Sequence, residues 1–598
     1  MADSKTPSTN GEQLITEHLD IWTTAIEQKS SAGRGSSKKF SLHGIKKLRE
    51  LILELAVRGK LVPQDPTDEP ASVLLERIAA EKAQLVIDKK IKKPKKLPEI
   101  NEDEKPFELP KRWEWSRLGE IAKKLTDGSH NPSRNNGEGY PMLSGQNVNY
   151  GKIDFANPSR YVDQENYDKE HSRTLVQEND VLLTIVGSIG RSAVVPSMAP
   201  KFVLQRSVAV ISTDLIPEFI CNQFISPICM RYFDKHAKGT AQKGIYLGKL
   251  SQMLLIIPPL DEQRRIVTKV DELMGLCDAL EAQTENSIAA HQTLIEVLLE
   301  ALLQAPEQNA TSEQATVQFQ QNWQRLSEHF DTLFTTTASI DTLKQTILQL
   351  AVMGKLVPQN PVDEPAGKLL ERIAAEKAQL IKDKKIKKSV STDSIITENC
   401  DWLLAEGWLS AELQDICRFI DYRGKNPKKS SSGIRIITAK NIRNGFIKNE
   451  PVEYVSEELY EQWMVRGLPQ KRDVLFITEG HTMGFVAQVD LDYKFALAQR
   501  TICLQRFSDF SPEYFRIALT SSQFQKSVKD NETGSAAGGI KASKLKRLKL
   551  PIPPLEEQHR IVTKVNELMA LCDQLKARLN DAQTTKLHLT DALVEQAS

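Results

Sequence analysis

The chain has 598 residues, more than one hydrophobic core can organise, so its length predicts several domains. Hydrophobic residues make up 40% of it and charged residues 26%, an ordinary composition for a soluble globular protein. The net charge is only +1, so any binding of nucleic acid must come from local basic patches rather than from a global positive field. The N-terminal segment lacks the apolar core of a signal peptide and no apolar run could span a bilayer, which predicts a soluble, intracellular protein without a membrane partner. Seven cysteines, none in a CxxC or Cys/His ligand pattern, argue against a zinc site and against a secreted disulfide scaffold.

The first 105 residues contain a block that returns later in the chain. Residues 74–85, LLERIAAEKAQL, recur at 369–380, and the flanking GKLVPQ, DEPA and DKKIKK segments recur with the same offset of 295 residues. Apolar residues at helical spacing predict helices over 48–57 and 343–352, each ended by the Gly and Pro of GKLVP. The LLERIAAEKAQL segments predict a second helix in each copy. The lysine-rich run at 89–96 favours a solvated helix end, with phosphate contact as the alternative.

Residues 106–257 form the first of two inserts between the repeated blocks, and residues 400–552 form the second. Short β-branched runs predict strands at 181–186 and 208–211 in the first insert and at 474–477 and 501–504 in the second. Trp113 and Trp408 keep the offset of 295, as do Leu118 and Leu413, so we expect the inserts to share one fold. A common fold with different surface residues is what two readers of different targets require.

A second repeated block predicts a long helix after each insert. Residues 258–280, PPLDEQRRIVTKVDELMGLCDAL, return at 553–575 as PPLEEQHRIVTKVNELMALCDQL. The Pro-Pro pair marks a helix start because proline fits the first helical turn, and the first helix is expected to run toward Leu303. Apolar residues alternate at spacings of four and three, which predicts a coiled-coil seam. The seam residues are Ile266, Val270, Leu273, Cys277 and Leu280 in the first helix and Ile561, Val565, Leu568, Cys572 and Leu575 in the second.

Polar loops at the same place in the two inserts are the leading candidates for DNA contact. The stretch from Asp421 to Glu450 contains eight Lys or Arg and two Asp or Glu. Arg and Lys bind guanine edges and phosphates, and Asn and Gln bind adenine, so this composition suits a loop that follows a groove or the backbone. A solvated polar loop is the alternative. The candidates are His130, Asn131, Arg134 and Asn135 in the first insert and Arg423, Lys425, Lys428, Lys429, Lys440, Asn441 and Arg443 in the second.

Further polar candidates occupy short segments that both inserts contain. The turn GSIGR at 187–191 resembles a nucleotide-binding loop but lacks the lysine, so it is either a turn between strands or a DNA-facing loop. A Gln-Arg pair occurs at equivalent positions in both inserts, which favours a phosphate or structural role because base readers should differ between the halves. These candidates are Ser188, Arg191, Gln205, Arg206, Gln242 and Lys243 in the first insert and His481, Gln499 and Arg500 in the second.

The sequence lacks the common motifs of catalysis. It contains no G-x-x-x-x-G-K-[ST] phosphate loop, no H-E-x-x-H and no G-x-S-x-G. The Asn-Pro-Pro-aromatic tetrapeptide of amino-methyltransferases is missing too, since neither Pro-Pro pair follows an asparagine. We therefore expect no catalytic residue, no metal and no cofactor bound by this chain. An enzyme with an unrecognised site and a two-arm adaptor that binds proteins are the alternative hypotheses.

The order of insert, PPLxEQxRIV helix, repeated block, second insert and second PPLxEQxRIV helix resembles the specificity subunit of type I restriction-modification enzymes. The resemblance also rests on four shorter segments, GSIG, KGTAQKGI, AVRGKLVPQ and LLERIAAEKAQL. The last two are repeated and resemble one subfamily in particular. It implies an α+β fold with two α/β target-recognition domains separated by two long antiparallel coiled-coil helices, in a pseudo-two-fold internal repeat. Its implied partners are double-stranded DNA, two methyltransferase subunits docked on the helix seam, and two restriction or motor subunits, in the prokaryotic cytoplasm. These partners would use S-adenosylmethionine, ATP and Mg, while this chain directs adenine methylation and restriction to an asymmetric bipartite target.

The repeats and the resemblance together divide the chain into five regions. We expect an N-terminal helical conserved region at 1–105 and a first target-recognition domain at 106–257. A central conserved region follows at 258–399, then a second target-recognition domain at 400–552 and a C-terminal conserved helix at 553–598. One half-molecule, a reader plus a helical strut, is thus used twice.

Overall fold

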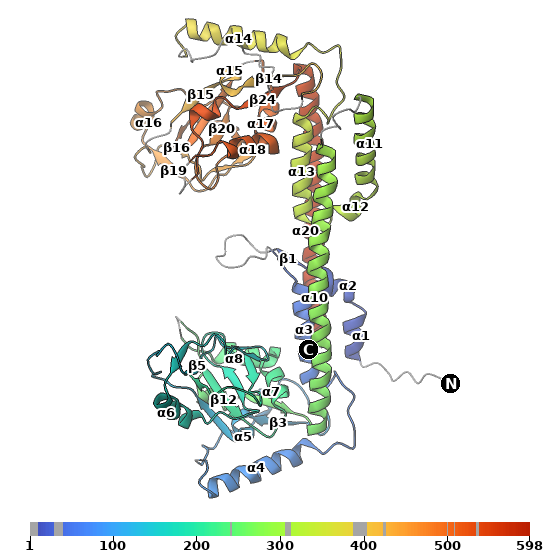
Figure 1. Cartoon of the computed structure of the whole chain (residues 1–598), viewed down its shortest axis with the longest axis vertical. Coiled ribbons are helices and arrows are strands. Elements are labelled where there is room, and N and C mark those ends of the chain that lie inside the picture. The colour runs from blue at the N-terminus through green and yellow to red at the C-terminus, as the bar shows by residue number, and fades with distance from the viewer. Residues whose placement is uncertain are drawn as a thin grey trace, which may run out of the picture. The chain divides into compact units, whose positions relative to one another are not determined.

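The computed structural model describes residues 10–28, 40–91, 93–239, 242–304, 312–386, 404–422, 426–498, 500–507, 509–533 and 538–597 (Figure 1). The chain divides into two compact units, which we call unit 1 (residues 1–287 with 582–598) and unit 2 (residues 288–581). Each unit contains one insert, one copy of the repeated helices, the first part of one long helix and the last part of the other. Within the described residues, no helix combines the length and the apolar character that crossing a membrane requires.

The repeated helices of unit 1 form where the apolar spacing predicts them. The helix expected over 48–57 is α3 (His43–Val57), and the helix expected over 74–85 is α4 (Ala71–Ile87). Gly59 follows α3 at φ +67°, a conformation that glycine adopts without strain, so the chain can turn there. Lys82 fixes α4 by donating to the backbone carbonyls of Gly119 at 2.8 Å and Glu120 at 2.7 Å. The smaller elements are α1 (Asn10–Thr16), α2 (Leu19–Thr24), β1 (Glu27–Gln28), β2 (Phe40–Ser41) and the short 3-10 helix η1 (Glu102–Glu104).

The first insert folds around a four-stranded antiparallel sheet in the order β10-β9-β12-β4 and a three-stranded sheet in the order β11-β5-β8, where β11 and β5 are parallel. The predicted strands are β9 (Val181–Thr184) and β12 (Val208–Ser212). Strands β3 (Glu114–Arg117) and β13 (Leu254–Ile257) pair antiparallel and bring the two ends of the insert together. The other elements are α5 (Leu118–Ile121), β4 (Lys124–Asp127), β5 (Tyr140–Leu143), β6 (Val148–Asn149), β7 (Lys152–Ile153), β8 (Arg160–Val162), α6 (Gln164–Thr174), β10 (Ser192–Val194), β11 (Val203–Leu204), α7 (Pro217–Phe224), α8 (Pro227–His236) and α9 (Leu247–Leu250).

Unit 2 repeats this plan, which confirms that the two inserts share one fold. Its repeated helices are α13 (Thr337–Val352) and α14 (Ala366–Lys382), and its sheets have the orders β15-β23-β20-β21 and β19-β16-β22. The predicted strands are β20 (Val474–Ile477) and β23 (Thr501–Arg506), and β14 (Leu409–Glu412) pairs with β24 (Lys549–Ile552) to close the insert. The other elements are α11 (Ser312–Glu328), α12 (Phe330–Leu333), α15 (Leu413–Ile416), β15 (Cys417–Asp421), β16 (Ile434–Ile437), β17 (Ile442–Arg443), β18 (Phe446–Ile447), β19 (Glu453–Val455), α16 (Glu457–Trp463), β21 (Val486–Gln488), β22 (Phe495–Leu497), α17 (Pro512–Thr520), α18 (Ser522–Asp530) and α19 (Ala542–Leu545).

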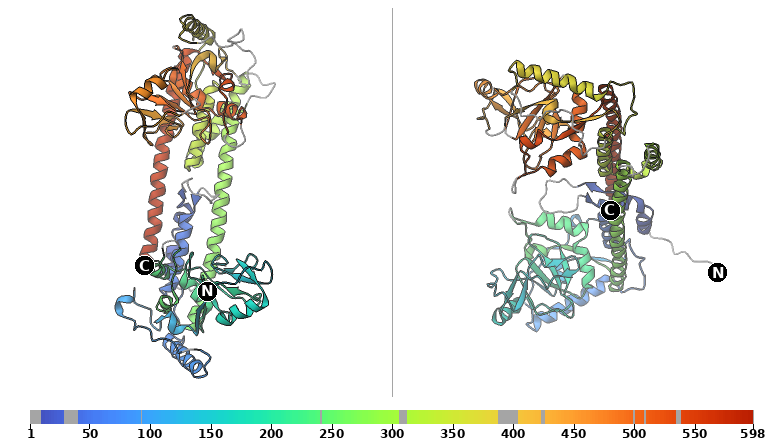
Figure 2. Two further views of the ribbon diagram at one scale, coloured as in Figure 1. Left: turned by 90° about the vertical axis from the view of Figure 1, so that its left-hand side faces the viewer. Right: turned by 45° about the horizontal axis from the view of Figure 1, so that its top comes forward.

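The two long helices are α10 (Leu260–Leu303) and α20 (Leu555–Ala597), each beginning directly after a Pro-Pro pair as predicted. The apolar stripe expected as a coiled-coil seam is largely buried, and in each unit a repeated helix covers it. In unit 1, Leu273 and Leu280 line a pocket together with Leu48 and Ile52 of α3, which lies alongside α10 in Figure 2. In unit 2, Ile561 and Val565 belong to one core with Leu343 and Ile347 of α13. Each stripe therefore packs on a short helix of its own unit, a partner that the seam pattern did not predict.

Candidate nucleic-acid interface

Each insert is fastened to its long helix by the same buried contact. Trp113 Nε1 donates to Glu262 Oε2 at 2.9 Å in unit 1, and Trp408 Nε1 donates to Glu557 Oε2 at 2.9 Å in unit 2. All four side chains are buried. Burial raises the pKa of Glu262 and of Glu557 above the ordinary value, because the charged carboxylate loses its water, and the indole bond only partly offsets this.

An ion pair near the start of each long helix is duplicated as well. Arg265 Nη2 lies 2.6 Å from Asp68 Oδ2 in unit 1, and Arg560 Nη2 lies 2.6 Å from Asp363 Oδ2 in unit 2. Asp68 is buried and Asp363 is half-buried, and both belong to the repeated DEPA segments. The frame that carries each insert is thus built with the same bonds in both units.

Asn441, expected as a DNA contact, is a buried structural residue instead. Its Oδ1 accepts from Thr438 N at 3.1 Å, and its Nδ2 donates to the carbonyls of Lys448 at 3.2 Å and Pro451 at 2.9 Å. The side chain is fully buried and both ends of its amide are satisfied inside the domain, so the prediction that it contacts DNA was wrong. Asn147 closes the corresponding loop of unit 1 with the same pattern of bonds. Their offset of 294 is a signal that a comparison of the two copies could have found.

The loop that follows the first strand of each main sheet is tied down by an arginine. In unit 1, Arg173 Nη2 donates to Asp127 Oδ1 at 2.7 Å and Arg173 Nε donates to the Asp127 carbonyl at 3.0 Å. In unit 2, Arg466 Nη1 donates to the Asp421 carbonyl at 2.6 Å. Sequence reasoning missed both arginines, although they follow their aspartates in the chain by 46 and 45 residues. His130, the first predicted contact, is exposed, and its Nε2 lies 2.9 Å from Asp127 Oδ2.

The remaining candidates of this loop differ in what holds them. Asn131 and Arg134 are exposed, with their side chains at the surface of the loop. Asn135 is exposed too, but its Oδ1 accepts from the backbone N–H groups of Gly137 at 3.1 Å and Tyr161 at 2.9 Å. Asn135 therefore shapes the loop, whereas Asn131 and Arg134 present their polar groups to solvent.

The turn at 187–191 of unit 1 lies beside Lys243 of the KGTAQKGI segment. Gly187 N donates to the Lys243 carbonyl at 2.9 Å, so Ser188 and the exposed Gln242 and Lys243 come to neighbouring positions. Ser188 is exposed. Arg191 at the end of the turn donates to Asn149 Oδ1 at 3.1 Å, so this side chain of the same domain orients the Arg191 guanidinium.

The two residues of the Gln-Arg pair of unit 1 have different surroundings. Gln205 Nε2 donates to Ser159 Oγ at 2.8 Å, which gives this glutamine a structural partner. Arg206 is exposed. In unit 2, Gln499 lies outside the described residues, as do Arg423 and Lys425, while Arg500 is exposed with φ +74°.

Three predicted contacts of unit 2, two from the polar stretch at 421–450 and one from the later Gln-Arg pair, meet at one pocket of about 220 Å³. It is lined by Lys429, Lys440 and Arg500, together with Glu453. Lys429 Nζ lies 2.8 Å from Glu453 Oε1, so this lysine is held by an ion pair, whereas Lys440 is exposed. Lys428 is also exposed, and Arg443 donates to the carbonyl of Ile442 at 2.9 Å.

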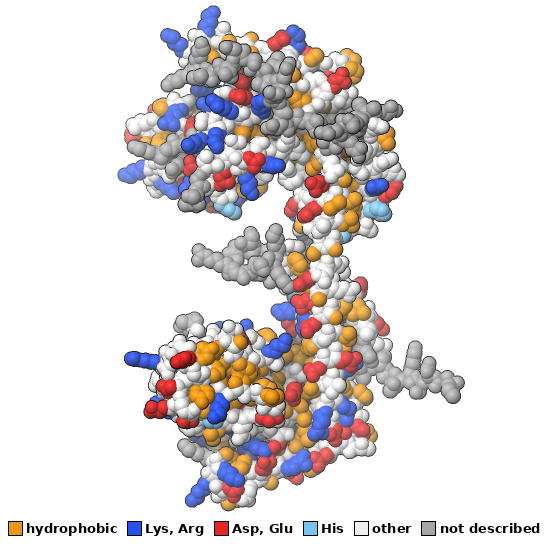
Figure 3. Space-filling model, in the orientation of Figure 1, with side chains coloured by type: hydrophobic (Ala, Val, Ile, Leu, Met, Phe, Trp, Pro, Cys, Tyr) orange, Lys and Arg blue, Asp and Glu red, His pale blue; other side chains and the backbone are white. Residues whose placement is uncertain are grey.

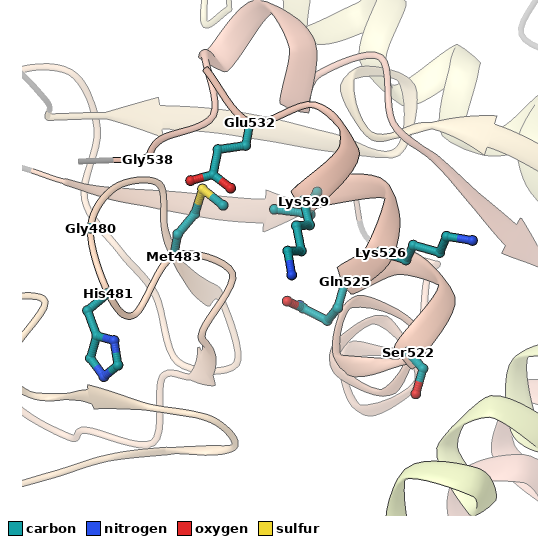
Figure 4. Close-up of a pocket in the computed structure, with 10 residues that line it drawn as sticks. Gly480, His481, Met483, Ser522, Gln525, Lys526, Lys529, Glu532 and Gly538 are labelled. Atoms are coloured by element: carbon teal, nitrogen blue, oxygen red, sulfur yellow. The ribbon is translucent and has the colours of Figure 1, made fainter. Parts of the chain in front are cut away.

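His481, predicted from the turn that corresponds to GSIGR, lines a second, wider pocket of unit 2 (Figure 4). The opposite wall is formed by α18, which the sequence reasoning did not include. In the view of Figure 3, Lys and Arg side chains are frequent on unit 2, while unit 1 shows a larger area of hydrophobic side chains. No group of three or more His, Cys, Asp or Glu in the described part of the chain is arranged to hold a metal ion.

Comparison with known proteins assigns the chain to a family. The family model of the type I restriction modification DNA specificity domain matches residues 110–290 and 405–582. The chain is 39% identical to the specificity subunit of the type I restriction enzyme EcoAI of Escherichia coli over 98% of this chain and 99% of that protein. It is 36% identical to the EcoEI specificity subunit of the same species over 98% and 99%. The crystal structure of the HsdS subunit from Thermoanaerobacter tengcongensis superposes with a TM-score of 0.37 at 17% identity, covering 83% of this chain and 98% of that one. The chain belongs to the family of type I restriction-modification specificity subunits.

Proposed function

We propose that the two inserts are separate readers, each of which recognises one half of an asymmetric, bipartite DNA target. The observation that carries this proposal is the contrast between frame and surface. The Trp113–Glu262 and Trp408–Glu557 contacts are the same in both units, whereas the exposed loops carry different side chains at equivalent places. A retained frame with divergent loops is expected where two copies of one domain bind different sequences.

The long helices set the distance between the two half-sites and provide the binding surface for two methyltransferase subunits, which recruit two restriction subunits. Each unit joins the start of one long helix to the end of the other, which supports an antiparallel, pseudo-two-fold arrangement. In unit 1, for example, α3 binds both: Arg49 pairs with Asp278 of α10 and Lys47 with Asp591 of α20. Joining two readers in this way makes the joint site much rarer and tighter than either half-site alone.

The chain has no catalytic site of its own and binds no cofactor. Its partners supply S-adenosylmethionine for adenine methylation and ATP with Mg for restriction, and this chain only selects where they act. The lack of a phosphate loop and of the Asn-Pro-Pro-aromatic tetrapeptide in its sequence supports this division of labour.

Exchange of one insert tests the two-reader model. Residues 106–257 are replaced by the matching insert of the EcoAI relative, and the chain is produced with its methyltransferase partner. Methylation-sensitive sequencing then maps the modified adenines. We expect one half of the target to change and the other half and the spacer to persist, and exchange of residues 400–552 should do the reverse.

Two outcomes contradict the proposal. If either exchange changes both half-sites, the inserts do not read independently. If the chain without its methyltransferase partner transfers methyl groups from S-adenosylmethionine to DNA, it is an enzyme in its own right.

A further inference from the structure

The second recognition domain contains a basic helix face that none of the predicted loops includes. Helix α18 buries Phe524 and Val528 in the core and turns its other side to a pocket of about 730 Å³. This side carries Ser522, Gln525, Lys526 and Lys529 at helical spacing. Ser521 caps the helix by accepting from Phe524 N at 3.4 Å, so the face is presented by a well-defined element rather than by a loop.

The opposite wall of this pocket is the turn at 480–484. Figure 4 shows Gln525 and Lys529 pointing from α18 toward the turn that carries His481 and Met483, while Lys526 points away from it. Gln525 Nε2 donates to the Gly484 carbonyl at 2.9 Å and thereby fixes the turn against the helix. Lys529 is exposed, and neither Lys526 nor Lys529 has an ion-pair partner among the residues that the structure describes.

This pocket adjoins the pocket formed by Lys429, Lys440 and Arg500. Gly480 lines the wider pocket, and a Cβ atom at Gly480 would lie 3.6 Å from Nη1 of Arg500. The neighbouring residue Glu479 also approaches Arg500, with 3.9 Å between Oε2 and Nε. The basic groups of the two pockets thus follow one another across the turn.

The first recognition domain carries a different charge at the same place. Helix α8 corresponds to α18 at the offset of 295, and both are capped by a serine, Ser226 and Ser521. Lys526 has a basic counterpart, Arg231, but Lys529 corresponds to the exposed Asp234. The face of unit 1 therefore presents a carboxylate where the face of unit 2 presents an ammonium group.

The polar wall is lost in unit 1 as well. Gln525 corresponds to Met230, and a Cβ atom at Gly190 of the facing turn would lie 2.8 Å from Met230 Sδ. The turn of unit 1 consequently packs closely on an apolar side chain. The basic, polar-walled pocket is a property of the second copy of the fold.

We propose that Lys529, with His481, contacts the phosphate backbone of duplex DNA beside the half-site that the second domain reads, and that the first domain has no such contact at Asp234. The proposal rests on the DNA-reading role proposed above. Lysine ammonium groups neutralise phosphates without reading bases, so this contact adds affinity and leaves the recognised sequence unchanged. Glu532 also lines the pocket, and Figure 4 shows Lys529 and His481 below its carboxylate, so we place the phosphate on that side.

The test measures the salt dependence of DNA binding by the full chain. The probe is a mixed-sequence duplex longer than one recognition site, which reports phosphate contacts without knowledge of the target. Loss of one phosphate contact lowers the slope of log affinity against log salt by about 0.9. We therefore expect Lys529→Gln to lower the slope by about one phosphate contact. Lys529→Asp introduces the negative charge that the first domain carries at this position, and it should lower the affinity further at every salt concentration.

Two matched variants separate a local contact from a general effect of charge. Lys368→Asp changes an exposed lysine of α14 in the same unit and should leave the slope close to that of the parent chain. Asp234→Lys in the first domain should raise the slope, because it creates the missing group there.

The methylation pattern distinguishes this proposal from the two-reader model. The Lys529 variants should methylate the same sequence as the parent chain at low salt. An unchanged salt slope in both Lys529 variants, or an equal fall in Lys368→Asp, overturns the phosphate contact even where exchange of the inserts still changes one half-site.

Discussion

The two recognition domains share the buried contacts that close their loops and differ in side chains that meet solvent. Asn147 and Asn441 close corresponding loops with the same bonds, while the exposed Asp234 and Lys529 occupy corresponding places with opposite charge. A buried amide that loses its partners leaves unsatisfied backbone groups in the core, whereas an exposed charge exchanges its contacts with water at little cost. The difference shows which residues the shared fold requires and which are free to differ between the two domains.

The interior also shows compensated change. In unit 1, Gln223 binds both backbone groups of Ile256, accepting from its N at 3.0 Å and donating to its carbonyl at 2.8 Å. In unit 2, Ile256 is replaced by Pro551 at the equivalent position of the strand. Proline has no N–H, so only its carbonyl needs a hydrogen-bond donor. Tyr514 supplies that donor, with its hydroxyl 3.0 Å from the Pro551 carbonyl. The two copies thus satisfy the same strand with different side chains because the strand itself offers different groups.

The largest expected effect tests the claim that Asn441 is structural. Asn441→Ala should lower the free energy of unfolding by about 3 kcal/mol, because it leaves three backbone groups of a buried loop without partners. Urea unfolding followed by tryptophan fluorescence measures the loss, and Asn147→Ala should behave alike. The control is Asn131→Ala on an exposed loop, which should change stability by less than about 0.5 kcal/mol. A stable Asn441→Ala chain with an altered methylation sequence would return Asn441 to the DNA readers.

An intermediate effect is expected at the compensated pair. Gln223→Ala should cost about 2 kcal/mol, because both backbone groups of Ile256 lose their partner, whereas Tyr514→Phe should cost about 1 kcal/mol for a single carbonyl. The same unfolding assay compares them. Equal losses in the two variants would mean that the strands do not differ in what they require, and the compensation argument would fail.

The smallest effect concerns pH and the likeness of the two Trp–Glu contacts. Because burial raises the pKa of Glu262 and Glu557 in the folded chain, the stability that the protonated carboxyl contributes is fully present below its ordinary pKa of 4.5 and is lost as pH rises through the raised value. Glutamine keeps the oxygen that accepts from the indole and does not titrate. Glu262→Gln and Glu557→Gln should therefore gain stability relative to the parent chain as pH rises through this window.

Unfolding midpoints measured on both sides of that window check the sign. Glu296→Gln, at an exposed position of α10, serves as the control and should show no such trend. If only one of the two buried variants gains stability with pH, the two contacts are not equivalent despite their equal distances.

The helices and main strands could be predicted from sequence because their signals are local. The apolar spacing of α3 and α13 and the Pro-Pro starts of α10 and α20 depend on residues only a few positions apart. The candidate site was harder, because an exposed asparagine and a buried one look the same in a polar loop. Asn441 was misassigned for this reason, and Lys529 was overlooked because helical spacing alone does not say which neighbouring turn the helix faces.

The repeated use of one half-molecule can be read from the amino-acid sequence alone, since the offset of 295 residues between the repeated blocks requires no knowledge of the fold. Which polar residues share a surface could be seen only in the folded chain. Lys429, Lys440 and Arg500 meet at one pocket because strands and turns distant in the chain are paired in the sheets, and α18 joins them through the turn at Gly480. Periodicity reports contacts along one element, whereas a binding surface is assembled from several elements by the packing of the core.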